Sequence, residues 1–135
     1  MTVIAIDPGK RKCGICAEDS EKGTLKKNIA DTEFIFDILK EYIIQFPDSE
    51  VICGNTFCGK ELAEKIKKDN INIILTDEKN STCLGRKLYW KLNPKPWWAF
   101  FIPSSMLVPK IRLDDYAAVI IARKYLNKNE FDICK

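Results

Sequence analysis

The sequence contains no histidine, and this absence removes several classes of active site. Without an imidazole there is no Ser-His or Cys-His nucleophile pair and no histidine general base. Zinc sites that need a histidine ligand are excluded for the same reason. Metal chemistry in this chain would therefore have to use other ligands.

Long apolar runs are also missing. No segment approaches the ~20 residues that a membrane span needs, and no signal peptide precedes the first expected strand. We therefore expect a cytoplasmic protein without membrane contact. A length of 135 residues fits one domain, residues 1–135, with a full hydrophobic core. The net charge of +3 says little about nucleic acid, so the positions of the charges matter more.

The six cysteines fit a reducing compartment better than a disulfide framework. Cys13 and Cys16 form a C-x-x-C pair, which can bind zinc or act in redox chemistry. This pair, however, lies in a segment that reads as a strand, where odd spacing sends the two thiols to opposite faces. We expect buried free cysteines here rather than a zinc or redox site.

The first strand organises the rest of the chain. Residues 3–6 form a continuous apolar run rich in β-branched side chains, which is typical of a central strand covered on both faces. The run stops on Asp7 and turns through Pro8-Gly9. A carboxylate at the end of a buried strand is costly unless a cation meets it. Asp7 is therefore a candidate functional residue.

Periodicity predicts an α/β fold. Strands are expected at residues 3–6, 13–18, 24–30, 50–54 and 71–76, and helices at 31 or 32 to 46, 59–68, 81–92 and 113 to about 127. Tight connections make the first three strands an antiparallel meander, and right-handed crossovers lay the last two parallel to the first. Apolar side chains on one face of the first helix are Phe34, Ile35, Ile38, Leu39, Tyr42 and Ile43. The predicted fold is thus a five-stranded mixed sheet flanked by helices.

Acidic residues fall at equivalent places in this fold. Asp7 ends the first strand, Glu78 follows the fifth, and Asp114-Asp115 opens the final helix. Carboxylates that converge repel one another, and oxygen ligands favour Mg²⁺ or Mn²⁺ as the cation that relieves the repulsion. Basic residues stand beside each acidic position: Lys10, Arg11, Lys12, Lys79, Arg86, Lys87, Lys110 and Arg112. Acidic side chains that can bind a metal, next to basic side chains that can bind phosphates, are typical of a site that cleaves phosphodiester bonds.

Each acid also has an ordinary structural interpretation. Asp7 could be a turn residue, and Glu78 a solvated strand end. Asp114 and Asp115 could complement the dipole of the first helical turn. The helical wheel does not choose between these last two, because both lie equally far from the expected solvent stripe of Arg123, Lys124 and Asn127.

Three motifs resemble one protein family. Asp7-x-Gly9-x-x-x-x-Gly14 resembles the opening motif of the RuvC-like nucleases in the RNase H-like superfamily. The segment 76–86, Thr-Asp-Glu-Lys-Asn-Ser-Thr-Cys-Leu-Gly-Arg, is similar to the D-E-R-x-[ST]-T-x-x-A-R motif of the YqgF branch. Residues 113–121 resemble that branch's final helix, V-D-x-x-A-A-V-x-I. The three motifs occur in the family's order and span nearly the whole chain.

The resemblance implies an RNase H-like fold and metal-dependent hydrolysis of nucleic-acid phosphodiesters. Carried over to this sequence, the catalytic and metal-binding acids are Asp7, Glu78 and Asp114, with Asp115 as a further candidate ligand. The motif glycines are Gly9, Gly14 and Gly54. Mg²⁺ or Mn²⁺ is the implied cofactor, and structured DNA, as in Holliday-junction resolution, or precursor 16S rRNA is the implied partner.

The chain also departs from the family pattern. Lys79 stands where the branch usually has arginine, Gly85 where it has alanine, and residues 54–56 replace the usual Gly-Leu-Pro. RuvC itself carries an acid on the fourth strand and a pair of acids in the final helix. This chain has no acid at Cys53, Gly54 or Asn55, and only alanines stand one turn beyond Asp114, which favours the YqgF branch and weakens the case for junction resolution.

Two other function classes stay open at this stage. The first is a non-catalytic nucleic-acid or ribosome-associated binding module with the same fold. The second is an ATP-binding protein, because the opening motif also occurs in actin-like kinases, which however need two such domains. The aromatic segment Trp97–Ile102 has three interpretations: packing on its own core, a homodimer contact, or a base-stacking platform.

Overall fold

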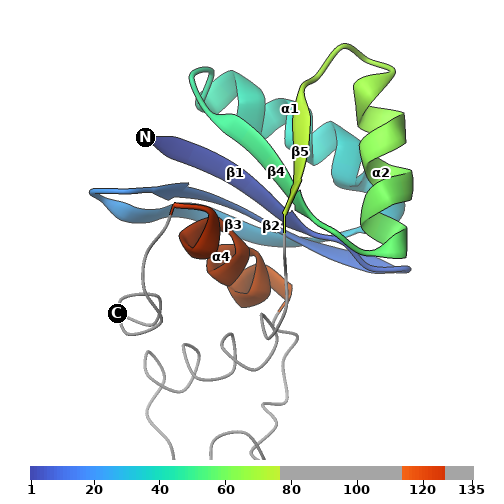
Figure 1. The fold of residues 1–135 in the computed structure, drawn as a ribbon, viewed down its shortest axis with the longest axis horizontal. Helices are drawn as coiled ribbons and strands as arrows, with labels where there is room; N and C mark the ends of the chain where they lie inside the picture. Colours follow the sequence, from blue (N-terminus) through green and yellow to red (C-terminus); the bar gives the residue numbers. More distant parts are fainter. Residues whose placement is uncertain (77–113, 127–135) are drawn as a thin grey trace, which may run out of the picture.

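The computed structural model describes residues 1–76 and 114–126. Its five strands form one sheet in the order β3-β2-β1-β4-β5 (Figure 1). The strands are β1 (Thr2–Asp7), β2 (Lys12–Asp19), β3 (Gly23–Asp31), β4 (Glu50–Gly54) and β5 (Ile73–Thr76). β1, β2 and β3 pair antiparallel, whereas β4 and β5 run parallel to β1. The predicted meander with two added parallel strands is confirmed.

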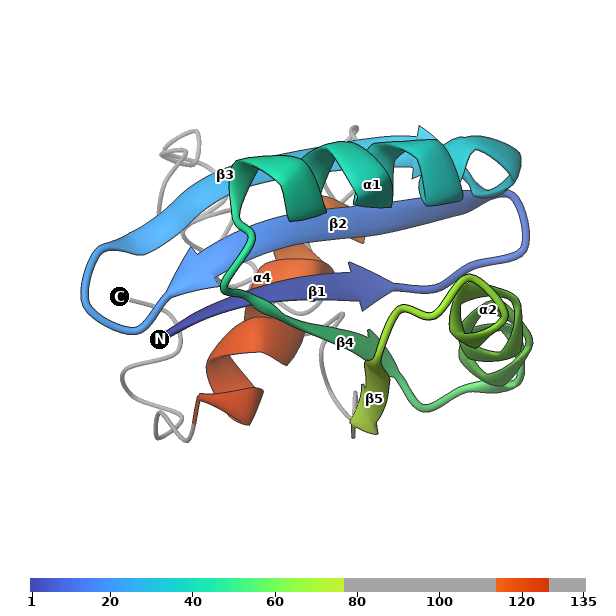
Figure 2. The ribbon, with the colours of Figure 1, turned by 90° about the horizontal axis from the view of Figure 1, so that it is seen from above.

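Helices cover both faces of the sheet. α1 (Ile35–Gln45) and α2 (Phe57–Lys67) lie on one face, and α4 (Asp114–Tyr125) crosses the other (Figures 1 and 2). None of the described helices is long and apolar enough to cross a membrane. The expected helix at 81–92 and the segment Trp97–Ile102 lie outside the described residues.

β1 contributes to two separate cores, as its continuous apolar run predicts. Ile4 and Ile6 point to the face under α1 and α2, whereas Val3 and Ala5 point to the face under α4. All four side chains are fully buried. The alternation of a strand thus divides one apolar run between two layers.

The first helix begins later than predicted. A 3₁₀ turn, η1 (Thr32–Phe34), precedes α1, and the Asp31 side chain makes no capping hydrogen bond. Asp31 instead pairs with Lys12 across the meander, at 2.6 Å. Because η1 rotates the chain before α1 starts, Phe34 is 52% exposed, and its assignment to the core face was wrong. Ile35, Leu39 and Tyr42 are buried as expected.

α2 shows a side-chain cap that the sequence analysis missed. Thr56 Oγ1 accepts a hydrogen bond from the backbone N–H of Gly59 at 3.1 Å, which starts the helix two residues before the predicted position. Leu62, Ala63 and Ile66 form its buried apolar stripe.

A buried ion pair anchors α4 to the sheet. Arg123 Nε donates to Glu18 Oε1 on β2 at 2.9 Å, and the exposed fractions of the two residues are 8% and 0%. Thr24 Oγ1 on β3 donates to the second carboxylate oxygen at 2.6 Å. The prediction that Arg123 lies on the solvent face of the helix was wrong. It assumed that a charged residue is exposed, and a helical pattern does not show whether a buried partner exists.

Replacing Arg123 with methionine tests this anchor. Methionine keeps much of the side-chain length but leaves the Glu18 carboxylate buried without its cation, and we expect a loss of about 3–5 kcal/mol in the free energy of unfolding. Urea denaturation measures it, with the exposed Lys60→Met as control. The combined Glu18→Leu and Arg123→Met variant should be more stable than Arg123→Met alone, since it removes the orphaned charge. A loss below about 1 kcal/mol for Arg123→Met would contradict the assignment.

Candidate functional site

Asp7 lies at the end of β1 between two positions that carry no side chain. Alternation along β1 puts Asp7 on the face of Val3 and Ala5, which α4 covers. Its partner in the β1–β2 register is Gly14. On the other side, Gly54 follows Cys53, the partner of Ile6. The motif glycines Gly14 and Gly54, which are both buried, therefore flank Asp7 on the α4 face without side chains of their own.

Thr76, at the end of β5, lies next to Gly54 on the side away from Asp7. It pairs with Gly54 in the parallel register. Its Oγ1 is buried and makes no hydrogen bond within the part of the chain that the structure describes. Carboxylate and hydroxyl oxygens without imidazole suit a hard cation such as Mg²⁺ better than zinc. The donors along this edge thus fit the predicted cofactor in type.

Tight packing and hydrogen bonds to Thr32 hold the turn after Asp7. A Cβ on Gly9 would lie 2.3 Å from the Lys12 carbonyl oxygen, so no larger residue fits without a shift of the backbone. Thr32 Oγ1 donates to the Gly9 carbonyl at 2.9 Å, and the Thr32 N–H donates to the Arg11 carbonyl at 2.8 Å. The start of η1 therefore fixes the turn that carries the first basic residues.

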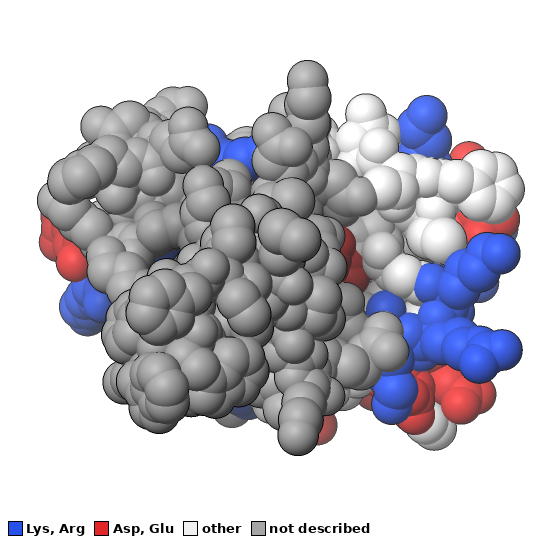
Figure 3. All heavy atoms as spheres, turned by 90° about the horizontal axis from the view of Figure 1, so that it is seen from below, with Lys and Arg blue, Asp and Glu red and all other residues white. Residues whose placement is uncertain are grey.

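The three basic residues of this turn differ in their surroundings. Lys10 and Arg11 are exposed. Lys12 is half-buried and paired with Asp31 at 2.6 Å. On the face seen in Figure 3, lysine and arginine side chains gather at one end of the described part, with acidic side chains among them. Lys10 and Arg11 are thus better presented to a polyanion than Lys12.

The first turn of α4 carries the acid pair. Asp115 is 14% exposed, and its Oδ2 lies 3.3 Å from Lys27 Nζ on β3. Its other oxygen, Oδ1, accepts a hydrogen bond from the Tyr116 N–H at 2.9 Å. Asp114 opens α4, but its side chain is not among those described. Asp115 is therefore already matched with a cation from the protein itself.

Cys16 links this turn of α4 to the Asp7 strand. Cys16 pairs with Ala5 on β1 and with Lys27 on β3. Ala5 and Cys16 are two residues along their strands from Asp7 and Gly14, and therefore lie on the same face of the sheet. Burial raises the pKa of the Cys16 thiol strongly, and the negative charges of Glu18 and Asp115 raise it further. Asp115 and Asp7 thus occupy the same face of the sheet, in neighbouring parts of it.

The C-x-x-C pair does not form a site. Cys13 belongs to the core under α1 and α2, and Cys16 to the core under α4, as strand alternation predicts. Neither forms a disulfide within the described part of the chain, and Cys13 Sγ lies 3.3 Å from Thr32 Oγ1. Within residues 1–76 and 114–126 no group of three or more cysteine or acidic side chains is arranged to hold a metal.

The remaining predicted site residues lie outside the described part of the chain. These are Glu78, Lys79, Arg86, Lys110 and Arg112. The described residues therefore supply Asp7, the start of α4 and the turn with Lys10 and Arg11, and the full acidic triad stays a prediction.

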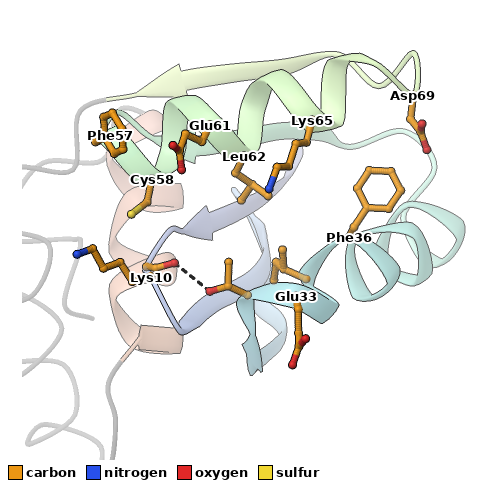
Figure 4. Close-up of a pocket in the computed structure, with 12 residues that line it drawn as sticks. Lys10, Glu33, Phe36, Phe57, Cys58, Glu61, Leu62, Lys65 and Asp69 are labelled. Atoms are coloured by element: carbon orange, nitrogen blue, oxygen red, sulfur yellow. Dashed lines mark hydrogen bonds between the residues drawn. The ribbon is translucent and has the colours of Figure 1, made fainter.

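A groove that the sequence did not predict lies on the opposite side of the sheet. It has a volume of about 540 Å³ and runs between α2 and the η1–α1 segment (Figure 4). Phe57, the first residue of α2, lies at its edge and is 77% exposed. The lining residues are Gly9, Lys10, Thr32, Glu33, Ile35, Phe36, Phe57, Cys58, Glu61, Leu62, Lys65 and Asp69.

A close backbone approach joins the start of α2 to the Asp7 turn. A Cβ on Gly59 would lie 2.0 Å from the Gly54 carbonyl oxygen and 3.1 Å from Pro8 Cγ. Only a residue without a side chain lets the helix pack so closely against the ends of β1 and β4. Gly59 therefore helps to set the position of the turn that follows Asp7.

Comparison with known proteins gives a likeness to solved structures. No protein-family model matches the sequence, and no curated protein matches it either. A structure of RuvC from Thermus thermophilus matches 94% of this chain and 97% of its own chain, with 14% identical residues and a TM-score of 0.49. At this level of identity the likeness concerns the fold and not the activity.

Gly59→Ala tests the close approach. In an exposed helix interior alanine is more favourable than glycine by ~1 kcal/mol, so a change that only affected helix propensity would raise stability. Here we expect the free energy of unfolding to fall by about 1–3 kcal/mol, because the added methyl group would clash with the Gly54 carbonyl and with Pro8. Thermal melting measures the effect, and the neighbouring exposed Lys60→Ala is the control. A melting temperature equal to or above that of the unaltered protein would contradict the contact.

Proposed function

We propose that this protein is a metal-dependent nuclease that hydrolyses phosphodiester bonds in structured DNA or precursor rRNA, and that it belongs with the YqgF branch of the RuvC-like nucleases. The observation that carries the proposal is the position of Asp7. It ends the central strand between two glycine positions, on the face that α4 covers. A half-buried carboxylate in such a place suits a cation, and the motifs around it resemble those of this family.

Asp7, Glu78 and Asp114 are the residues that would hold Mg²⁺ or Mn²⁺. Bound there, the cation would polarise the phosphate and lower the pKa of a water molecule. The ion pair between Asp115 and Lys27 favours Asp114 as the ligand from α4. Asp115 then serves to orient the first turn of the helix.

Lys10 and Arg11 would bind phosphates of the substrate backbone, because they are exposed on the turn directly after Asp7. Lys12 contributes less, since its charge is matched by Asp31. Arg86, Lys79, Lys110 and Arg112 remain predicted phosphate contacts. A cytoplasmic location and a homodimer are also predictions.

Replacing Asp7 with asparagine tests the proposal. The change keeps the size of the side chain and removes the charge that a cation needs, so cleavage should fall by about a hundredfold or more. The substrates are a four-way DNA junction and an RNA that spans the 5′ end of 16S rRNA in its precursor, each assayed with Mg²⁺ and with Mn²⁺. Asp37→Asn is the matched control, because Asp37 is an exposed carboxylate on α1.

Full cleavage by Asp7→Asn would overturn the proposed site. Salt-sensitive binding of either nucleic acid without cleavage by the unaltered protein would instead favour the binding module.

A further inference from the structure

Lys27 on β3 sits between two residues of the first turn of α4. Its Nζ lies 3.3 Å from Asp115 Oδ2 and 4.3 Å from the centroid of the Tyr116 ring. Tyr116 is 8% exposed and belongs to the core under α4. The ammonium group therefore contacts a carboxylate on one side and an aromatic ring on the other.

This pair is more protected than an ordinary surface salt bridge. The exposed fractions of the Lys27 and Asp115 side chains are 35% and 14%. Burial lowers the pKa of Lys27, but the charge of Asp115 and the contacts with Tyr116 outweigh it and raise the pKa overall. Lys27 stays protonated near neutral pH, so Asp115 has a permanent cation beside it.

We propose that Lys27 is a positioning residue that neutralises Asp115 and thereby leaves Asp114 as the one α4 carboxylate available to a divalent cation. The inference rests on the proposed function, because it assigns a role within the same acidic site. An ammonium group that occupies Asp115 competes with a metal for that carboxylate. The Lys27 charge also reduces the net negative charge of the site, and this weakens the electrostatic attraction for a divalent ion several ångströms away.

Lys27→Met removes the ammonium and leaves the Asp115 charge uncompensated. Mn²⁺ affinity should increase about three- to tenfold, because one more negative charge then acts on the ion. Equilibrium titration followed by electron paramagnetic resonance of free Mn²⁺, near neutral pH and without nucleic acid, measures this affinity apart from any activity. Lys27→Arg keeps the charge and should bind Mn²⁺ like the unaltered protein, within about twofold.

The neighbouring Lys26 offers a matched control. Its Nζ lies 3.1 Å from Gln45 Oε1 and 4.8 Å from the centroid of the Tyr42 ring, on the α1 side of the sheet. Lys26→Met removes the same charge and a comparable ring contact from the next residue of the same strand. It should leave Mn²⁺ affinity unchanged within about twofold, because Lys26 lies on the face of the sheet opposite to Asp7.

The combined Lys27→Met and Asp115→Asn variant isolates the pair. It should return Mn²⁺ affinity to within about twofold of the unaltered protein, because both charges of the pair are gone. Asp115→Asn alone leaves the ammonium unmatched and should weaken Mn²⁺ binding about three- to tenfold.

Three results would overturn the inference, and they separate it from the proposed function. If Lys27→Met and Lys26→Met bind Mn²⁺ equally, Lys27 has no part in the site. If Asp115→Asn loses Mn²⁺ binding by about a hundredfold or more, Asp115 is itself a ligand. In both cases the nuclease proposal stands. If the unaltered protein binds no Mn²⁺, the proposed function fails and the role of Lys27 fails with it.

Discussion

The contact between Arg123 and Glu18 decides where α4 lies, and the candidate site depends on that placement. An unpaired charge with no access to water is so costly that the helix cannot slide or rotate away from β2 without a large loss in free energy. The acid pair at the start of α4 lies about two and a half turns before Arg123. A fixed helix therefore gives the acids a fixed place on the sheet. Tyr125, which donates to the Glu50 carboxylate at the start of β4, adds a second attachment.

The register of β1 decides which layer receives the carboxylate. Even-numbered residues of the strand face α1 and α2, and odd-numbered residues face α4. A shift of one residue would bury the Asp7 side chain in the opposite core and turn Ile6 toward the site. Pairing of all six β1 residues with β2 excludes such a shift. The same register brings Gly14 beside Asp7, so a position without a side chain stands next to the carboxylate.

Local patterns in the sequence were sufficient for the fold. Two-residue alternation and apolar runs identified the strands, and helical spacing identified α1, α2 and α4 with shifts of a few residues at their ends. The sheet order followed from short connections and right-handed crossovers. Features that depend on a capping turn were placed less well, as with Phe34 and the start of α2, because the 3₁₀ turn and the Thr56 cap change the residues at the helix start.

Contacts between distant residues were beyond these patterns. Arg123 was assigned to solvent because its partner Glu18 is 105 positions away in the sequence. Periodicity did not choose between Asp114 and Asp115, and the contact on which our proposal for this choice rests comes from Lys27, 88 positions before Asp115. The position of Asp7 at the end of β1 was predicted from the apolar run alone. Its partnership with Glu78 and Asp114 rests on the motifs and stays a prediction.

The long separation between Glu18 and Arg123 has a consequence for biosynthesis. During translation the N-terminal meander leaves the ribosome well before α4 exists. Until then α4 does not cover the face of the emerging sheet that carries Val3, Ala5 and Cys16, and Glu18 lacks its contact with Arg123. A nascent chain in this state exposes apolar strands to other chains. α4 is therefore synthesised after the strands that it covers. Slow synthesis of the segment that contains α4 would lengthen the period in which those strands are exposed to other chains.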